Sequence, residues 1–198
     1  MPRLLIATNN NGKVLELRAL LQDLPAELVT PADLGLQLQV AEDGSTYAEN
    51  AQDKATAFAE ASGLISLADD SGLEVQALDG APGLHSARYL AKPGATDAER
   101  RSFLLRNLSS KPRPWLAKFR SAVAIAVPGA GVQIAEGYCD GEIVPDERGT
   151  GGFGYDRIFY IPEVAQTMAE LSLEAKNRVS HRAQAVIHAR PILERLFG

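Results

Sequence analysis

Two neighbouring acids, Asp69 and Asp70, follow an apolar run at residues 64–68 that is predicted to be a buried strand. Ligand sites of α/β sheets gather at the carboxyl ends of strands, and adjacent carboxylates there attract Mg²⁺. Because neighbours in an extended chain point to opposite faces, only one of the two acids need meet a metal. The alternative is a solvated Asx turn made by Asp70, Ser71 and Gly72. A second acidic pair, Glu42 and Asp43, is either surface charge or a source of a second metal ligand.

A polar segment between a predicted strand and a predicted helix offers hydroxyl, amide and ammonium donors. It consists of Thr8, Asn9, Asn10, Asn11, Gly12 and Lys13. Such donors at the positive end of a helix dipole are typical of an anion site, above all a phosphate site. The phosphate-loop pattern of a Walker motif is absent. By itself the segment is equally typical of an ordinary turn, since Asn and Gly are common turn formers.

A glycine-rich loop at residues 149–156 presents two aromatic side chains, Phe153 and Tyr155. Glycines let the backbone come close to a ligand, and an exposed ring there can stack on a base. The alternative is a tight turn with Phe153 in the core. Lys176, His181 and Arg182 follow in a basic cluster, which either complements a helix dipole or recognises a purine edge or phosphates.

Apolar periodicity predicts strands that alternate with helices, the pattern of an α/β fold. The strands are expected at residues 4–7, 64–68, 73–78, 119–127 and 132–138, with a possible strand at 36–40. The helices are expected after residue 13 and ending before 25, over 46–61, over 96–107 and from 172 onward. Thr46 with Glu49 and Thr96 with Glu99 predict two capping boxes. Pro191 is expected to break or kink the last helix near residue 190.

Composition excludes several classes of protein. The 198 residues include 20 Lys and Arg against 25 Asp and Glu, giving a net charge of −5, whereas general nucleic-acid binding needs a basic excess. The single cysteine, Cys139, cannot form an intrachain disulfide, and no apolar run approaches the ~20 residues of a membrane span. We therefore expect one soluble, cytoplasmic domain over residues 1–198 that binds neither nucleic acid nor a membrane.

Four segments taken together carry a specific resemblance. They are residues 8–13, residues 68–73 with 83–89, residues 151–156 and residues 180–182. In this order they resemble the inosine/xanthosine triphosphate pyrophosphatases, enzymes that remove non-standard purine nucleotides, and the resemblance covers essentially the whole chain. It implies a mixed α/β fold with a long, twisted central sheet flanked by helices, and two lobes with an active-site cleft between them. It also implies a homodimer that cleaves a purine nucleoside triphosphate to the monophosphate and pyrophosphate with Mg²⁺.

The resemblance also implies roles for individual residues. Asp70 is the expected proton acceptor and a metal ligand, with Glu42 as the second ligand and Asp43, Glu49 or Asp69 as alternatives to it. Ser71 is expected to contact the substrate. The segment from Thr8 to Lys13 matches the triphosphate-binding loop. The expected nucleoside-binding set is Phe153, Gly154, Tyr155, Asp156, Lys176, His181 and Arg182. This chain has Arg157 where the family commonly has proline, a departure that leaves the base-facing residues in place.

Two other classes of function compete with this interpretation. A regulatory module that binds purine triphosphates without hydrolysing them would keep both loops, but would have no need of Asp69 and Asp70 beside a metal. An RNA-binding protein could use the basic run at residues 100–120, which contains no acid, but it would be expected to carry a basic net charge. We therefore expect the pyrophosphatase.

Overall fold

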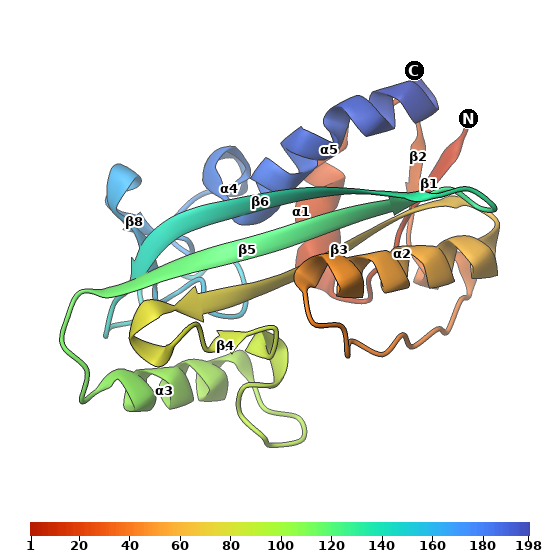
Figure 1. Cartoon of the computed structure of the whole chain (residues 1–198). Coiled ribbons are helices and arrows are strands. Elements are labelled where there is room, and N and C mark those ends of the chain that lie inside the picture. Colours follow the sequence, from red (N-terminus) through yellow and green to blue (C-terminus); the bar gives the residue numbers. More distant parts are fainter. The chain divides into compact units, whose positions relative to one another are not determined.

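A computed structural model describes residues 1–198 as eight strands and five α-helices (Figure 1). The strands are β1 (Arg3–Ile6), β2 (Glu27–Val29), β3 (Ile65–Val75), β4 (Pro82–Gly83), β5 (Trp115–Ala126), β6 (Val132–Ile143), β7 (Phe159–Ile161) and β8 (Gln166–Thr167). The helices are α1 (Asn11–Leu20), α2 (Tyr47–Ser62), α3 (Asp97–Leu108), α4 (Leu173–Val179) and α5 (His181–Phe197). No helix is both long and apolar enough to cross a membrane.

All eight strands belong to one mixed sheet. Their order is β2-β1-β3-β5-β6-β7-β8, and β4 pairs with β3. β1 runs parallel to both β2 and β3, whereas β7 is antiparallel to β6 and to β8. The predicted α/β class with a mixed central sheet is therefore confirmed, and the predicted hairpin is found as the longer strands β5 and β6.

The chain divides into two compact units. Unit 1 comprises residues 1–70, 121–137 and 182–198, and unit 2 comprises residues 71–120 and 138–181. The prediction of a single domain over residues 1–198 stays a prediction.

Unit 1 has a core on each face of β1, as the alternation of side chains along a strand requires. Leu4 and Ile6 pack with residues of α1 and α5, whereas Leu5 and Ala7 pack with residues of α2. The helices α1 and α5 thus cover one face of this part of the sheet, and α2 covers the other (Figure 1). The sheet segment that carries the predicted site is therefore enclosed on both faces.

Unit 2 has a core of its own, in which β3 and β5 meet α3. Leu73 of β3 and Phe119 of β5 lie in one buried cluster with Leu104 and Leu108 of α3. The predicted capping box of α3 is complete, because the Thr96 hydroxyl and the carboxylate three residues later each accept a backbone N–H. This box fixes where α3 begins, which matters below because its first two turns contact the glycine-rich loop.

The capping box predicted for α2 forms only in part. Thr46 caps the helix by accepting a hydrogen bond from Glu49 N at 3.1 Å. The Glu49 carboxylate, however, accepts from Ser45 N at 2.7 Å, one residue before the expected partner. The start of α2 is nevertheless where the pattern predicts it.

Two strand predictions are wrong. The runs at residues 64–68 and 73–78 are not separate strands, because β3 is continuous from Ile65 to Val75 and passes through Ser71 and Gly72. Asp69 and Asp70 therefore lie in the middle of a strand and not at its carboxyl end, and they do not form a turn. Pairing of β3 with its neighbours outweighs the local turn preference of these residues. Residues 36–40 form no strand.

Two helix boundaries also differ from the prediction. α1 ends at Leu20, short of the expected limit before Pro25. At the other end of the chain the break falls at Ser180, whose extended backbone (φ −69°, ψ 152°) separates α4 from α5. Pro191 lies inside α5, on its exposed side, where water can satisfy the carbonyl group that loses its helical donor.

Candidate active site

The polar segment after β1 extends into a helix, because α1 begins at Asn11 and not after residue 13 as predicted. Thr8 Oγ1 accepts a hydrogen bond from Asn10 N at 3.2 Å, and Asn10 Oδ1 caps α1 by accepting from Lys13 N at 3.1 Å. The side chains of Asn9 and Asn11 are exposed, and Gly12 is half-buried. The first turn of α1 contains no acid, so its positive end can receive an anion.

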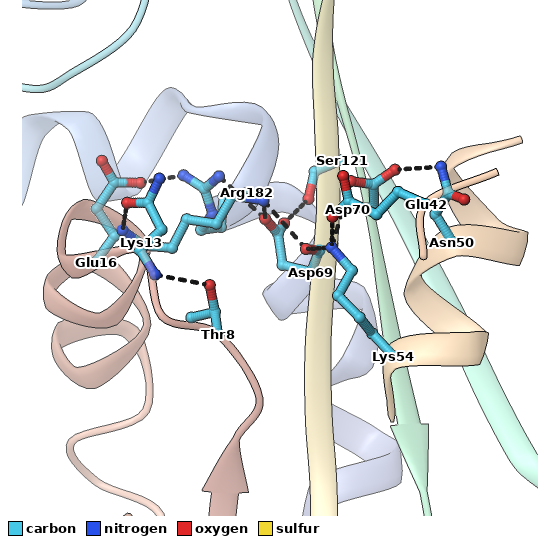
Figure 2. A network of polar contacts seen from close by, with 11 residues as sticks. Thr8, Lys13, Glu16, Glu42, Asn50, Lys54, Asp69, Asp70, Ser121 and Arg182 are labelled. Atoms are coloured by element: carbon cyan, nitrogen blue, oxygen red, sulfur yellow. Dashed lines mark hydrogen bonds and ion pairs between the residues drawn. The ribbon is translucent and has the colours of Figure 1, made fainter. Parts of the chain in front are cut away.

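Asp69 and Asp70 point to opposite sides of β3, as predicted (Figure 2). On one side, Asp69 Oδ2 lies 2.7 Å from Lys13 Nζ and 3.1 Å from Arg182 Nη2, and Oδ1 accepts from Ser121 Oγ at 2.5 Å. Burial alone would raise the pKa of Asp69, but Arg182 and Lys13 hold it well below its ordinary value. Asp69 is therefore a buried carboxylate ion with two cations at one oxygen and a hydroxyl donor at the other.

Arg182, in the first turn of α5, connects Asp69 to α1. Its Nη1 donates to Glu16 Oε2, while its Nη2 donates to Asp69 Oδ2 at 3.1 Å. Only 1% of Arg182 and 3% of Glu16 are exposed, so charge pairing is required to keep both ions in the interior. We call Lys13, Glu16, Asp69, Ser121 and Arg182 the Asp69 network.

The other side of β3 presents Asp70 to α2. Asp70 Oδ2 accepts from Asn50 Nδ2 at 3.1 Å, and Asp70 Oδ1 lies 3.5 Å from Lys54 Nζ. Lys54 Nζ also donates to Glu42 Oε1 at 2.6 Å and to the Asp69 carbonyl at 3.3 Å. Asn50 and Lys54 are one turn apart and so share a face of α2. We call Glu42, Asn50, Lys54 and Asp70 the Asp70 group.

The electrostatics of the Asp70 group differ from those of the Asp69 network. Burial raises the pKa of Asp70 above its ordinary value, although Lys54 and Lys13 oppose the shift. Burial would also lower the pKa of Lys54, but Asp70 and Glu42 raise it. Asp70 is thus a carboxylate with an increased tendency to accept a proton, which is the property that a general base requires.

The residues present fit a divalent cation held by two carboxylates. Glu42 and Asp70 converge on one point, because the same Lys54 ammonium group contacts both of them. Asp43 is exposed and Glu49 accepts hydrogen bonds from Ser45, so the structure favours Glu42 over these two alternatives. No group of three or more His, Cys, Asp or Glu side chains is arranged for metal binding. Mg²⁺ suits such a site, since it takes one or two carboxylates and fills its shell with phosphate oxygens and water.

Unit 2 carries the glycine-rich loop. Asp156 Oδ2 accepts from Phe153 N at 2.9 Å and from Lys176 Nζ at 2.6 Å, and that ammonium group lies 5.3 Å from the centre of the Phe153 ring. Gly152 is required here, because its φ is +68° and a Cβ atom would lie 2.0 Å from Asp156 Oδ2. The loop thus brings together three residues of the predicted nucleoside-binding set.

Other members of that set lie in the interior of unit 2. Tyr155 is 4% exposed and donates its hydroxyl hydrogen bond to the Ser86 carbonyl at 2.9 Å, and burial raises the pKa of the phenol. His181 is also 4% exposed and stacks on Phe119 with ring centres 4.6 Å apart. Ser71 is half-buried. The substrate-binding roles of all these residues stay predictions.

Sequence reasoning missed four residues that complete the Asp69 network and the Asp70 group. They are Glu16, Asn50, Lys54 and Ser121. One signal was available, since Asn50 and Lys54 are polar residues one turn apart in a helix otherwise rich in alanine. Glu16 has no comparable signal, because its partner lies 166 residues away in the sequence.

Nearly the whole chain matches a known family. A family model described as the Ham1 family covers residues 4–192. The chain belongs to the Ham1 family. Among solved structures of Ham1 proteins, that from Coxiella burnetii is 39% identical, with a TM-score of 0.87 and coverage of 98% of this chain and 100% of that one. The Staphylococcus aureus Ham1 protein is 37% identical, with a TM-score of 0.85 and coverage of 98% and 99%.

Several members of the Ham1 family that resemble this chain carry a functional name. A protein of Desulforamulus reducens named dITP/XTP pyrophosphatase is 47% identical over 196 residues, which is 98% of this chain and 97% of that protein. A Geobacillus kaustophilus protein of the same name is 45% identical over 199 residues, covering 100% of this chain and 97% of that protein. The family predicted from the four sequence segments is thereby confirmed.

Proposed function

We propose that this protein hydrolyses non-standard purine nucleoside triphosphates (ITP, dITP and XTP) to the monophosphate and pyrophosphate. The observation that carries the proposal is the Asp70 group: a carboxylate with a raised pKa beside Lys54 and Glu42, on the strand that also carries the partner of Lys13. Near relatives named dITP/XTP pyrophosphatase support the substrate class. Such an activity removes abnormal precursors from the nucleotide pool.

The reaction requires water to attack the α-phosphorus while the bond to the bridging oxygen of the β-phosphate breaks. We propose that Asp70 accepts the proton of that water, a role that its raised pKa favours. Lys13, with the start of α1, binds the polyphosphate, and Lys54 balances the negative charge beside Asp70. Phosphoryl transfer needs mostly positioning and charge stabilisation, and these residues supply both.

Mg²⁺ dependence is part of the proposal, with Glu42 and Asp70 as the ligands. When bound, the ion would neutralise phosphate charge and lower the pKa of a coordinated water. Lys54 contacts both carboxylates and therefore keeps them close to each other when no metal ion is bound. The Asn50 amide holds the other oxygen of Asp70, which limits rotation of the carboxylate.

We propose that unit 2 binds the nucleoside. Phe153 stacks on the base, a contact worth roughly 1–3 kcal/mol that does not distinguish one base from another. Base choice must then come from hydrogen bonds to the purine edge, because hypoxanthine and xanthine carry an acceptor at O6 where adenine carries an amino group. His181 and backbone groups near Phe153 are the proposed donors from unit 2, and Arg182 of unit 1 is a further proposed donor. Sites of this kind reject a mismatched analogue by about 10⁴–10⁵-fold.

The cellular setting is also proposed from the resemblance. We infer that the protein acts in the cytoplasm as a homodimer. The single cysteine, Cys139, is consistent with a reducing compartment, since no intrachain disulfide is possible. Sedimentation of the purified protein tests the homodimer directly.

The deciding experiment measures pyrophosphate release from ITP, dITP, XTP, GTP and ATP, each with Mg²⁺ and with excess chelator. The proposal predicts release from the first three, weak release from the last two, and loss of release with chelator. Binding of ITP without release of pyrophosphate would instead support a nucleotide-sensing module. Release of inorganic phosphate would show that a different phosphoanhydride bond is cleaved. The variant Asp70→Asn serves as the control for contaminating activity.

A further inference from the structure

Helix α3 holds both peptide groups of Gly154. The amide N of Gly154 donates to Asp97 Oδ2 at 2.7 Å, and its carbonyl O accepts from Arg101 Nη1 at 2.7 Å. Asp97 is the first residue of α3 and Arg101 follows one turn later, so the two side chains lie on the same face of the helix. The carboxylate of Asp97 therefore binds the amide group of Gly154, and the guanidinium of Arg101 binds its carbonyl group.

The guanidinium of Arg101 is also held by a second partner outside residues 149–156. Its guanidinium forms a two-pronged ion pair with Glu147, with Nε 2.8 Å from Oε1 and Nη2 3.0 Å from Oε2. Only 6% of the Arg101 side chain is exposed. A planar guanidinium bound on one edge has little freedom, so the direction of the bond from Nη1 to Gly154 is set in advance.

These contacts determine how the neighbouring side chain, Phe153, is directed. The peptide group before Phe153 is held because Phe153 N donates to Asp156 Oδ2 at 2.9 Å. The peptide group after Phe153 contains Gly154 N, which Asp97 holds. Peptide groups are planar, so fixing the planes on both sides of an α-carbon fixes φ and ψ, and with them the direction of the Cα–Cβ bond. Gly154 adopts a φ of +59°, a conformation that favours glycine.

We propose that Asp97 and Arg101 are positioning residues, which hold the two peptide groups of Gly154 in the orientation that presents the neighbouring Phe153 to the base. The inference rests on the proposed function and extends it to residues that do not touch the nucleotide. An aromatic ring held in its binding orientation loses less conformational entropy when the ligand arrives, which strengthens nucleoside binding.

The charge state of Asp97 is consistent with this role. Burial would raise the pKa of Asp97, but the hydrogen bonds from Gly154 N and from Arg100 lower it below its ordinary value. Asp97 is therefore ionised at neutral pH and accepts the Gly154 amide hydrogen as a charged acceptor, which forms a stronger hydrogen bond than a neutral one.

The test compares two ligands that probe different parts of the substrate. Inosine monophosphate probes nucleoside binding, and inorganic tripolyphosphate probes the polyphosphate site of unit 1. The full-length variants are Asp97→Ala, Arg101→Met and the conservative Asp97→Asn, which keeps an acceptor oxygen. Arg106→Gln is the matched control. Arg106 is an exposed cation of α3, and the hydrogen bonds of Gly154 go to Asp97 and Arg101 instead. Calorimetry gives both dissociation constants, and steady-state kinetics give kcat and KM for ITP.

Loss of one charged hydrogen bond is expected to weaken inosine monophosphate binding about tenfold in Asp97→Ala and in Arg101→Met. KM for ITP should rise by a similar factor with kcat nearly unchanged, while tripolyphosphate affinity stays within about twofold of wild type. Asp97→Asn should restore most of the lost affinity, and Arg106→Gln should match wild type. Unchanged inosine monophosphate affinity in both Asp97→Ala and Arg101→Met would overturn the inference, as would an equal loss for both ligands.

Amide hydrogen exchange separates this inference from the proposed function. In Asp97→Ala the Gly154 amide loses its acceptor, so its exchange should accelerate about tenfold or more while the rest of α3 keeps its protection. Unchanged exchange at residues 152–156 would overturn the inference even if the enzyme is active. The wild-type protein could release no pyrophosphate while loop exchange is accelerated in Asp97→Ala. That result would overturn the proposed function, but it would still show that Asp97 holds the Gly154 amide.

Discussion

The two sides of β3 place the same side chain, an aspartate, in opposite electrostatic environments. Asp69 is 1% exposed, and its carboxylate contacts Lys13, Ser121 and Arg182 in the interior of unit 1. Asp70 is 7% exposed and its partners, Asn50 and Lys54, belong to a single helix. Fixed cations lower the pKa of the first acid, whereas burial raises the pKa of the second.

This difference comes from how the charges around each aspartate are compensated. The Asp69 network neutralises its charges internally, so removal of any of its charged members leaves a buried ion without compensation. The Asp70 group retains excess negative charge, because Glu42 and Asp70 share one lysine. The first arrangement suits a structural support, and the second suits a site that receives a proton or a cation.

The largest effect is expected from Asp70→Asn. Loss of a general base lowers turnover by roughly 10²–10⁴-fold, and loss of a metal ligand adds to this. Thermal unfolding should remain near wild type, since asparagine can still accept from Asn50. Pyrophosphate release measures the turnover, and a melting curve measures the stability. Near wild-type turnover would move the catalytic role away from Asp70, with Asp69 the first alternative.

Asp69→Asn should show the reverse pattern, with the main loss in stability. Removing one partner of a buried ion pair typically costs about 3–5 kcal/mol, because the remaining charges stay buried. Urea unfolding measures the free-energy change, and Ser121→Ala provides a milder companion variant that removes only a neutral donor. If Asp69→Asn unfolds at the same urea concentration as wild type, the Asp69 network does not stabilise the fold.

Lys13→Ala tests whether the Asp69 network also serves the substrate. Loss of a charged contact should weaken binding of a triphosphate by roughly 10–100-fold, and binding of the monophosphate product much less. Calorimetry with ITP in the presence of chelator and with inosine monophosphate gives the comparison. Equal losses for the two ligands would show that residues 8–13 are not a polyphosphate site.

Arg182→Lys tests the proposed part of Arg182 in base choice. Lysine keeps a positive charge for Glu16 and Asp69 but lacks the guanidinium fork, so the number of directed donors falls. The ratio of kcat/KM for ITP to that for ATP should fall about tenfold. A ratio equal to that of wild type, with both values lowered together, would confine Arg182 to the Asp69 network.

The smallest effects concern pH, and they should differ in sign between the two acids. The pKa of Asp69 is lowered on folding, so its stabilisation is present above the unfolded-state value of about 3.9 and is lost as pH falls through the lower folded value. The pKa of Asp70 is raised on folding, so its unfavourable contribution develops as pH rises through the folded value. In chelator, the small stability difference between Asp70→Asn and wild type should therefore shift in favour of the variant as pH rises from 3 to 7, whereas that of Asp69→Asn should shift against it. Urea titrations across that range decide.

Local signals predicted the elements that depend on local contacts. The start of α2 follows from Thr46, which caps the helix, and the start of α3 follows from Thr96 with its partner acid. The α/β class follows from the alternation of periodic segments. Each of these features is determined by residues within a few positions of one another, so the sequence alone contains the necessary information.

Features that depend on distant residues were not predictable in the same way. Ser71 and Gly72 favour a turn locally, yet both lie within β3, because pairing along the sheet decides the conformation. Pro191 was expected to interrupt the last helix, but the interruption falls at Ser180, which carries no glycine or proline signal. Similarly, Glu16 is not marked as a site residue by its immediate neighbours, because its partner lies 166 residues away.

The pairing of Glu16 with Arg182 spans 166 residues and ties the start of the chain to its last helix. During synthesis, α1 and β3 leave the ribosome long before α5, so Asp69 and Glu16 have no guanidinium partner until the final residues emerge. Asp69 can pair with Lys13 in the meantime, but burying Glu16 earlier would be unfavourable, because an uncompensated charge is expensive to bury. Closure of this part of the molecule is therefore deferred to the end of translation, and a prematurely terminated product would retain an open, protease-sensitive interior.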